Sequence, residues 1–145
     1  MQDISETEAA YRRYHDVIRR GAPREEFAGV VDMDTYREEC VGFTPGWVDA
    51  EGALQSFARV TGALRDLQVD FDELNVVGDR VFARLRVSAT LPGPGPDPTA
   101  PSGRRVTLQG ADFVSVRNGR VVERWWIVAT APPRLQPVDT PAPPA

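Results

Sequence analysis

Asp112 is the residue of this sequence best placed for acid–base chemistry. It stands in the middle of the last predicted strand pair, among apolar side chains. The two strands meet at Asn118-Gly119, a dipeptide typical of a two-residue type I′ turn. With unbroken pairing from that turn, Asp112 lies opposite Trp125, and Glu123 shares their face of the sheet. A carboxyl group buried against an indole ring can keep its proton near neutral pH, so the pattern indicates a general acid or base.

Glu38, Glu39 and His15 are the other candidates for proton transfer. Neighbouring residues of an extended segment point to opposite sides, so only one of the two glutamates can face inward. His15 stands on the first predicted helix, where a surface position is the simpler interpretation, but an imidazole above a cavity could relay protons. For Asp112, the alternative to catalysis is a structural carboxylate that only accepts hydrogen bonds from backbone amides.

The composition excludes several other kinds of chemistry. All basic residues are arginine, so there is no lysine to form a Schiff base. One histidine and one cysteine cannot supply the ligands of a usual zinc site, and no EF-hand or HExxH pattern occurs. There is also no glycine-rich phosphate-binding motif. We therefore expect no metal and no cofactor.

The charge and hydropathy patterns bear on partners and location. The 145 residues carry a net charge of −4 with scattered arginines, unlike the continuous basic surface of a nucleic-acid-binding protein. No apolar run is long enough to cross a membrane, and no signal peptide opens the chain. We expect a soluble cytoplasmic protein with neither nucleic-acid nor membrane partners.

Hydrophobic spacing predicts three helices followed by strands. An irregular segment rich in aromatic residues, 32–47, separates the second helix from the third. A Gly/Pro-rich segment at 92–103 has the composition of a long loop, and a proline-rich tail covers 132–145. The predicted helices span about 5–20, 23–31 and 50–66, and the predicted strands begin near residues 68, 80, 104 and 120.

Helices followed by a meandering sheet indicate the α+β class. We expect a cone-shaped, curved antiparallel sheet wrapped around the N-terminal helices, in a single domain at 1–131 with a flexible tail behind it. The cone would enclose an apolar cavity with Asp112 at its depth, and Trp126, on the opposite face, would be buried in a dimer. The predicted substrate-binding residues are Tyr14, Tyr36, Trp47, Phe57, Leu85, Leu91, Glu123 and Trp125.

The order and spacing of several short motifs resemble those of the SnoaL-like polyketide cyclases, members of the nuclear transport factor 2-like fold class. The resemblance covers about residues 8–129. It rests on Arg20-Gly21, Tyr36, Asp66-Leu67, Gly78-Asp79-Arg80-Val81, the PSGRRVT run at 101–107, Gly110-Ala111-Asp112, and the NGRVVE run at 118–123 with Trp125.

This resemblance implies a homodimer formed through the outer sheet face, and closure of a ring in a hydrophobic polyketide-like molecule without metal or organic cofactor. It implies that Asp112 is the acid–base residue of an intramolecular aldol condensation. Alignment favours Glu39 over Glu38 as the second polar group. Many relatives carry a histidine where this sequence has Leu91, so an acid–base group is missing there.

We therefore predict a cofactor-independent cyclase of antibiotic or other natural-product biosynthesis, with aldol-type or pericyclic ring closure assisted by Asp112. Two alternatives stay open. The first is epoxide opening, by a hydrolase or a polyether-type cyclase, which requires two inward carboxylates within reach of one ligand. The second is a small-ligand-binding domain without catalytic activity.

Overall fold

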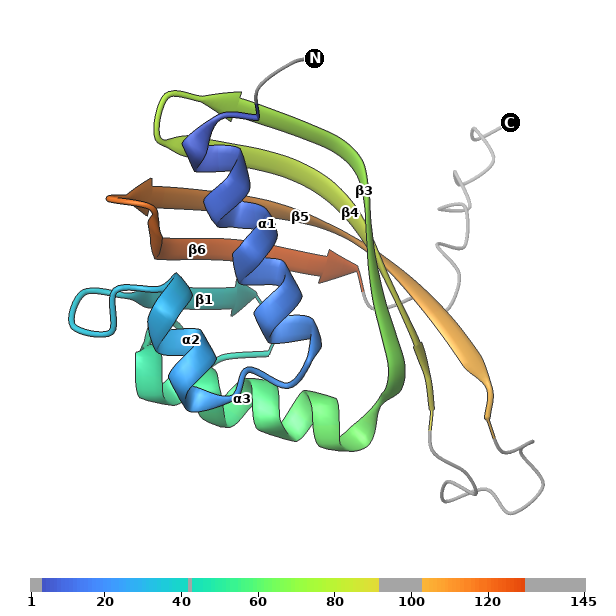
Figure 1. Cartoon of the computed structure of the whole chain (residues 1–145). Coiled ribbons are helices and arrows are strands. Elements are labelled where there is room, and N and C mark those ends of the chain that lie inside the picture. The colour runs from blue at the N-terminus through green and yellow to red at the C-terminus, as the bar shows by residue number, and fades with distance from the viewer. Residues whose placement is uncertain (1–3, 42, 92–102, 130–145) are drawn as a thin grey trace, which may run out of the picture.

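The structure is a computed structural model that describes residues 4–41, 43–91 and 103–129, and Figure 1 shows the arrangement of its elements. The predicted loop at 92–103 lies outside the described residues except for its last position. The predicted tail at 132–145 lies outside them altogether.

Six strands form one curled sheet in the order β2-β1-β6-β5-β4-β3 (Figure 1). The predicted α+β class is confirmed, but the sheet is mixed rather than wholly antiparallel, because β1 runs parallel to β6. Strand β1 comes from the segment predicted to be irregular, and β2 follows directly after that segment. The strands are β1 (Arg37–Val41), β2 (Val48–Asp49), β3 (Arg65–Val77), β4 (Arg80–Thr90), β5 (Arg105–Arg117) and β6 (Arg120–Ala129).

Three helices cover the concave side of the sheet and the end near β1 (Figure 1). Helix α1 crosses the sheet and contacts β3, β4, β5 and β6. Side-chain caps begin two of the helices: Ser5 accepts a hydrogen bond from the Glu8 amide at 3.1 Å, and Asp49 accepts one from the Gly52 amide at 2.9 Å. The helices are α1 (Glu6–Arg19), α2 (Arg24–Val30) and α3 (Ala50–Ala63).

The predicted turn between β5 and β6 is confirmed, with φ values of 51° at Asn118 and 73° at Gly119, as a type I′ turn requires. The even pairing predicted beyond the turn is wrong. Val116 pairs with Val121, but the next pair is Ser115 with Glu123, so one extra residue of β6 forms a β-bulge.

The bulge reverses the two faces of β6 relative to β5, because a shift of one residue turns each side chain to the other side. Asp112 therefore lies opposite Trp126 instead of Trp125. The predictions that Trp125 and Glu123 face inward, and that Trp126 faces outward, are wrong. Arg124 takes the inward position and is buried.

Gly110 allows β5 and β6 to approach closely beside Asp112. A Cβ atom at this position would lie 2.6 Å from the backbone oxygen of Ile127, which cannot move without parting the strands. We expect Gly110→Ala to lower the free energy of unfolding by about 1–3 kcal/mol, measured by urea denaturation. Gly62→Ala, in α3 with no atom within 4 Å of its Cβ, is the control and should be neutral or stabilising. Equal effects of the two changes would contradict the close approach.

Candidate functional site

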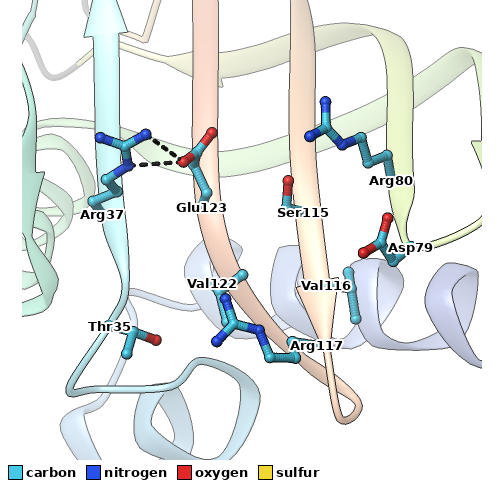
Figure 2. Close-up of a pocket in the computed structure, with 9 residues that line it drawn as sticks. All are labelled: Thr35, Arg37, Asp79, Arg80, Ser115, Val116, Arg117, Val122 and Glu123. Carbon is cyan, nitrogen blue, oxygen red and sulfur yellow. Dashed lines mark hydrogen bonds and ion pairs between the residues drawn. The ribbon is translucent and has the colours of Figure 1, made fainter.

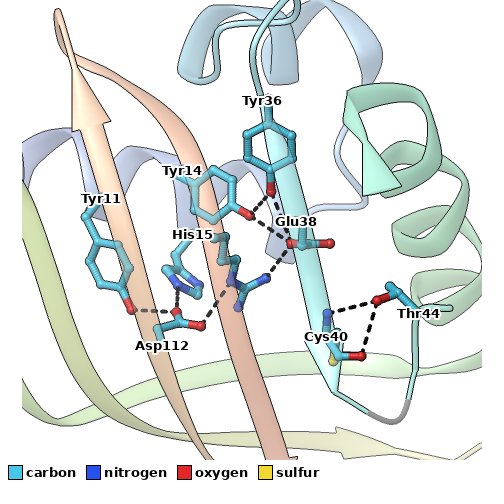
Figure 3. Close-up of polar contacts among 9 residues, drawn as sticks. Tyr11, Tyr14, His15, Tyr36, Glu38, Cys40, Thr44 and Asp112 are labelled. Atoms are coloured by element: carbon cyan, nitrogen blue, oxygen red, sulfur yellow. Dashed lines mark hydrogen bonds and ion pairs between the residues drawn. The ribbon is translucent and has the colours of Figure 1, made fainter. Parts of the chain in front are cut away.

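Asp112 lies at the centre of a buried polar network on the concave side of the sheet (Figure 3). Its Oδ2 atom accepts a hydrogen bond from the Tyr11 hydroxyl at 2.7 Å and lies 2.6 Å from Nε2 of His15. Its Oδ1 atom accepts a hydrogen bond from Nε of Arg124 at 3.0 Å. Helix α1 thus supplies two partners of the carboxylate, and β6 supplies the third.

Arg124 connects Asp112 to a second buried carboxyl group, that of Glu38 on β1. Nη1 of Arg124 donates to Oε1 of Glu38 at 3.2 Å. The Tyr14 and Tyr36 hydroxyls donate to the same oxygen at 3.3 and 3.1 Å and lie 2.7 Å from each other. One buried cation therefore bridges two carboxyl groups, and one tyrosine hydroxyl also binds Asp112 while two bind Glu38.

Asp112 is ionised in this network. Burial alone would raise its pKa, but Arg124 and then His15 lower it below the ordinary value. Burial lowers the pKa of Arg124, but Asp112, Glu38 and the two tyrosines together outweigh burial and raise it. The prediction that Asp112 keeps its proton near neutral pH is wrong, because the residue is paired with a buried arginine.

Glu38 differs from Asp112 in its affinity for protons. Burial raises its pKa, and the opposing effect of Arg124 is not large enough to cancel the increase. The pKa values of the Tyr14 and Tyr36 hydroxyls are also raised, first of all by burial, so these groups stay protonated donors. Two neighbouring carboxyl groups with opposite pKa shifts are an arrangement typical of acid–base sites.

His15 is buried, and burial lowers its pKa below the usual 6.5, although Asp112 acts in the opposite direction and Arg124 adds to the decrease. The unfolded chain therefore binds this proton at a higher pH than the folded chain. We expect the free energy of unfolding to fall as the pH drops below about 6.5, by up to about 1.4 kcal/mol per pH unit. His15→Gln, followed by urea denaturation at each pH, should flatten this part of the profile. An unchanged profile would contradict a neutral buried imidazole.

Several predicted site residues lie on the outer face of the sheet instead. Glu39, which alignment favoured, accepts a hydrogen bond from Nε1 of Trp125 at 2.9 Å, while Glu38 faces inward. Glu123 forms an ion pair with Arg37 at 2.7 Å. Trp47 is 43% exposed, and the Arg37 guanidinium covers its ring at 4.3 Å. The predicted residues Glu39, Trp47, Glu123 and Trp125 therefore do not belong to the Asp112 network.

The remaining predicted residues lie elsewhere on the inner side. Phe57 is buried in the core against Phe27. Leu91, at the end of β4, is half-buried and does not contact Asp112 through any hydrogen bond; its amide donates to the Arg104 carbonyl at 2.9 Å. Leu85 is buried on the concave side, two residues along β4 from the partner of Asp112.

An apolar surface adjoins the network on the concave side. Leu85 pairs with Gly110 of β5 and with Phe71 of β3. The next row of inward-facing side chains across β3, β4 and β5 is half-buried, so a ligand beside the charged groups can contact its apolar surface. This row consists of Val69, Val87 and Leu108.

The sequence analysis missed Arg124 and Tyr11 as members of the site. For Tyr11 a signal existed, because residues four apart share a face of a helix and His15 follows it by four. For Arg124 the only signal was the adjacent apolar pair Val121 and Val122, which interrupts the alternation of apolar and polar residues along the strand. Both residues are buried, and the bulge lies at this pair.

A separate polar groove of about 330 Å³ lies on the outer face, near the β5–β6 turn (Figure 2). The Arg37–Glu123 ion pair lies along it, and Arg80 and Arg117 line it further. The groove contains no member of the Asp112 network.

Two further observations concern the described residues only. Among them, no three His, Cys, Asp or Glu side chains are grouped so as to hold a metal ion. None of the helices in this part of the chain is long and apolar enough to span a membrane.

Comparison with known proteins identifies relatives of the chain. Residues 8–136 match the family described as SnoaL-like polyketide cyclase. A search of the curated proteins gave no match. Among solved structures, IdmH of Streptomyces antibioticus, a candidate polyketide cyclase, has a TM-score of 0.73 at 18% identity, covering 86% of this chain and 93% of its own.

Two other solved structures are similar over the same extent. A candidate SnoaL-like polyketide cyclase from Jannaschia sp. CCS1 has a TM-score of 0.68 at 20% identity, covering 89% of this chain and 92% of its own. TsrD from Streptomyces laurentii has a TM-score of 0.65 at 22% identity, with the same coverage of 89% and 92%. These likenesses confirm the expected nuclear transport factor 2-like fold.

Proposed function

Because the chain belongs to the SnoaL-like polyketide cyclase family, we propose that it is a cofactor-independent cyclase that closes a ring in a hydrophobic polyketide-like molecule. The observation that carries this proposal is the buried Asp112–Arg124–Glu38 network beside apolar surface. Acid–base catalysis of a ring closure needs both a proton acceptor and a proton donor. The opposite pKa shifts favour Asp112 as the acceptor and make Glu38 the carboxyl group of the two that holds a proton more readily.

In an aldol-type closure, a proton leaves a carbon next to a carbonyl group and a proton is returned to the oxygen of the second carbonyl. The ionised Asp112 favours the first step, and a protonated Glu38 is suited to the second. The half-buried apolar surface of Val69, Val87 and Leu108 would fold the flexible chain so that its two reacting carbons meet. Such positioning lowers barriers by up to roughly 7–11 kcal/mol in the best intramolecular cases.

Incubation with a linear poly-β-carbonyl thioester tests this function. We expect a cyclic product with the mass of the substrate, or one water lighter, formed faster than in buffer and detected by mass spectrometry and NMR. Binding of the thioester without accelerated ring closure would instead support a ligand-binding domain without catalytic activity.

Epoxide opening is a second candidate function, favoured by one specific observation. It needs two inward carboxyl groups near one ligand, and Asp112 and Glu38 share the guanidinium of Arg124. One carboxylate would activate water or a substrate hydroxyl while the other protonates the epoxide oxygen. Conversion of styrene oxide to a diol in ¹⁸O-labelled water would support this candidate. If the protein closes the ring of the thioester but does not open styrene oxide, epoxide opening is dismissed.

We also propose that a second copy of the chain covers the outer sheet face. Phe113 and Ile127 are 43% and 41% exposed there, and Phe113 packs against Phe82 and Trp125 with ring centroids 5.4 Å apart in each pair. An apolar patch across three strands is typical of a protein interface, and a twofold axis would pair it with itself.

Phe113→Arg tests this dimer. A charge at the centre of the patch should convert a dimer into a monomer in sedimentation-velocity experiments, because two like charges would meet across the twofold axis. Arg19→Ala, an exposed position of helix α1 on the other side of the sheet, is the control and should leave the dimer intact. A wild-type protein that sediments as a monomer would contradict the proposal.

A further inference from the structure

Two buried polar atoms beside Asp112 are left unexplained by the network. Among the described residues, Nδ1 of His15 and Nε1 of Trp126 are the buried side-chain nitrogen or oxygen atoms without a hydrogen-bond partner. Such atoms are rare, since an unpaired polar group in the interior costs free energy. Both atoms flank the same ion pair: His15 binds Asp112, and the Trp126 ring covers the Arg124 guanidinium at 4.2 Å. A molecule bound beside this ion pair would find in them two hydrogen-bond partners that the protein leaves unused.

The contacts of Asp112 determine which nitrogen of His15 carries the proton. An ionised carboxylate only accepts hydrogen bonds. Nε2 of His15, at 2.6 Å from Oδ2, must therefore be the donor. In a neutral imidazole the other nitrogen then holds a lone pair, so Nδ1 is a free base. The indole Nε1 of Trp126 can only donate, so the two unpaired atoms are one acceptor and one donor.

We propose that Nδ1 of His15 takes the proton of the substrate, and that the indole N–H of Trp126 donates a hydrogen bond to the oxygen that then becomes negative. This inference rests on the proposed aldol-type cyclase and names its substrate class, a β-dicarbonyl compound with an acidic C–H group. In this form of the mechanism, Nδ1 of His15 replaces Asp112 as the proton acceptor and Glu38 as the proton donor, and Asp112 acts as a positioning residue through His15.

The proton and electron balance of the step is complete without a further reactant. The C–H bond breaks, its proton moves to Nδ1 of His15, and its electron pair spreads onto the carbonyl oxygen. The enolate carbon then attacks the second carbonyl group and forms the C–C bond of the ring. The resulting alkoxide receives the proton from Nδ1, which restores the neutral imidazole.

Nitrogen NMR tests the tautomer directly, because His15 is the only histidine of the chain. In protein labelled with ¹⁵N-histidine, we expect a protonated Nε2 and an unprotonated Nδ1 near neutral pH. Acetylacetone, a β-dicarbonyl probe, should shift the Nδ1 signal and the indole N–H signal of Trp126, assigned with Trp126→Phe. A protonated Nδ1 in the free protein, or no shift of either signal, would overturn the proposal.

Deuterium exchange of acetylacetone tests the chemistry. The protein should speed exchange of the central C–H protons with D₂O above the rate in buffer. We expect His15→Gln to reduce the protein-dependent rate by about 10²-fold or more, and Trp126→Phe to reduce it by about tenfold. Unaltered exchange in His15→Gln would overturn the proposal, whereas an exposed change such as Asp72→Asn should have no effect.

The Asp112→Asn variant separates positioning from direct catalysis. Arg124 must keep an oxygen as its acceptor, so the amide NH₂ of the new side chain faces His15 and makes Nε2 an acceptor. We expect the ¹⁵N signals to show the proton on Nδ1 and the exchange rate to fall. Ring closure of the thioester that persists in His15→Gln would overturn this inference while leaving the cyclase function in place.

Discussion

Arg124→Met is expected to lower the free energy of unfolding by about 3–5 kcal/mol, the usual cost of removing one partner of a buried ion pair. Arg124 is buried and, within the part of the chain that the structure describes, is the only cation bonded to Asp112 or Glu38, because the His15 imidazole beside Asp112 is neutral. Without it, two carboxyl groups face each other without a compensating charge. The pKa of Asp112 should rise, because its largest stabilising charge is lost. Urea denaturation at neutral pH measures the change.

The matched control is Arg84→Met, which removes an arginine from an exposed ion pair with Glu73 on the neighbouring strand. Pairs of this kind contribute about 1 kcal/mol or less. A third variant, Arg124→Met combined with Asp112→Asn, should recover part of the lost stability because it removes a stranded charge. Similar losses in the two single variants would show that burial of Arg124 matters less than the structure indicates.

Local patterns were sufficient to predict most of the secondary structure. The period of 3.6 residues located α1, and the Asn118-Gly119 dipeptide fixed the turn of the last hairpin, since both depend on neighbouring residues alone. Strand β1 was missed because its five residues are too few for a clear period, and because its partner β6 lies about 85 positions later in the chain.

The residues that surround Asp112 in the site were harder to predict than Asp112 itself. Asp112 could be found because a single carboxyl group stands out among apolar neighbours. Its ionisation state could not, because that depends on Arg124, and Arg124 faces inward only as a consequence of the β-bulge. Because of one extra residue in β6, Trp126 and Arg124 face inward in place of Trp125 and Glu123. Such a bulge changes which chemistry the strand presents without altering the fold.

Asp112→Asn is expected to reduce kcat/KM for ring closure by about 10²–10⁴-fold, the range typical of lost acid–base catalysis. The change keeps the size of the side chain and leaves an oxygen for Arg124, so the network should stay assembled around it. The substitution removes the negative charge of Asp112, which holds His15 in one tautomer. The positive charge of Arg124 is then no longer balanced by that carboxylate. Steady-state kinetics with the poly-β-carbonyl thioester, together with urea denaturation of the same variant, measure both consequences.

Asp72→Asn provides the control for this variant, because Asp72 lies on β3 in an exposed ion pair with Arg86 and away from the network. Its turnover should equal that of the wild type. If Asp112→Asn folds and keeps its turnover, proton transfer through Asp112 is not the dominant contribution. Folding of the substrate against the apolar surface would then lower the barrier by positioning, as in a pericyclic closure, with the Asp112 site reduced to a hydrogen-bonding support.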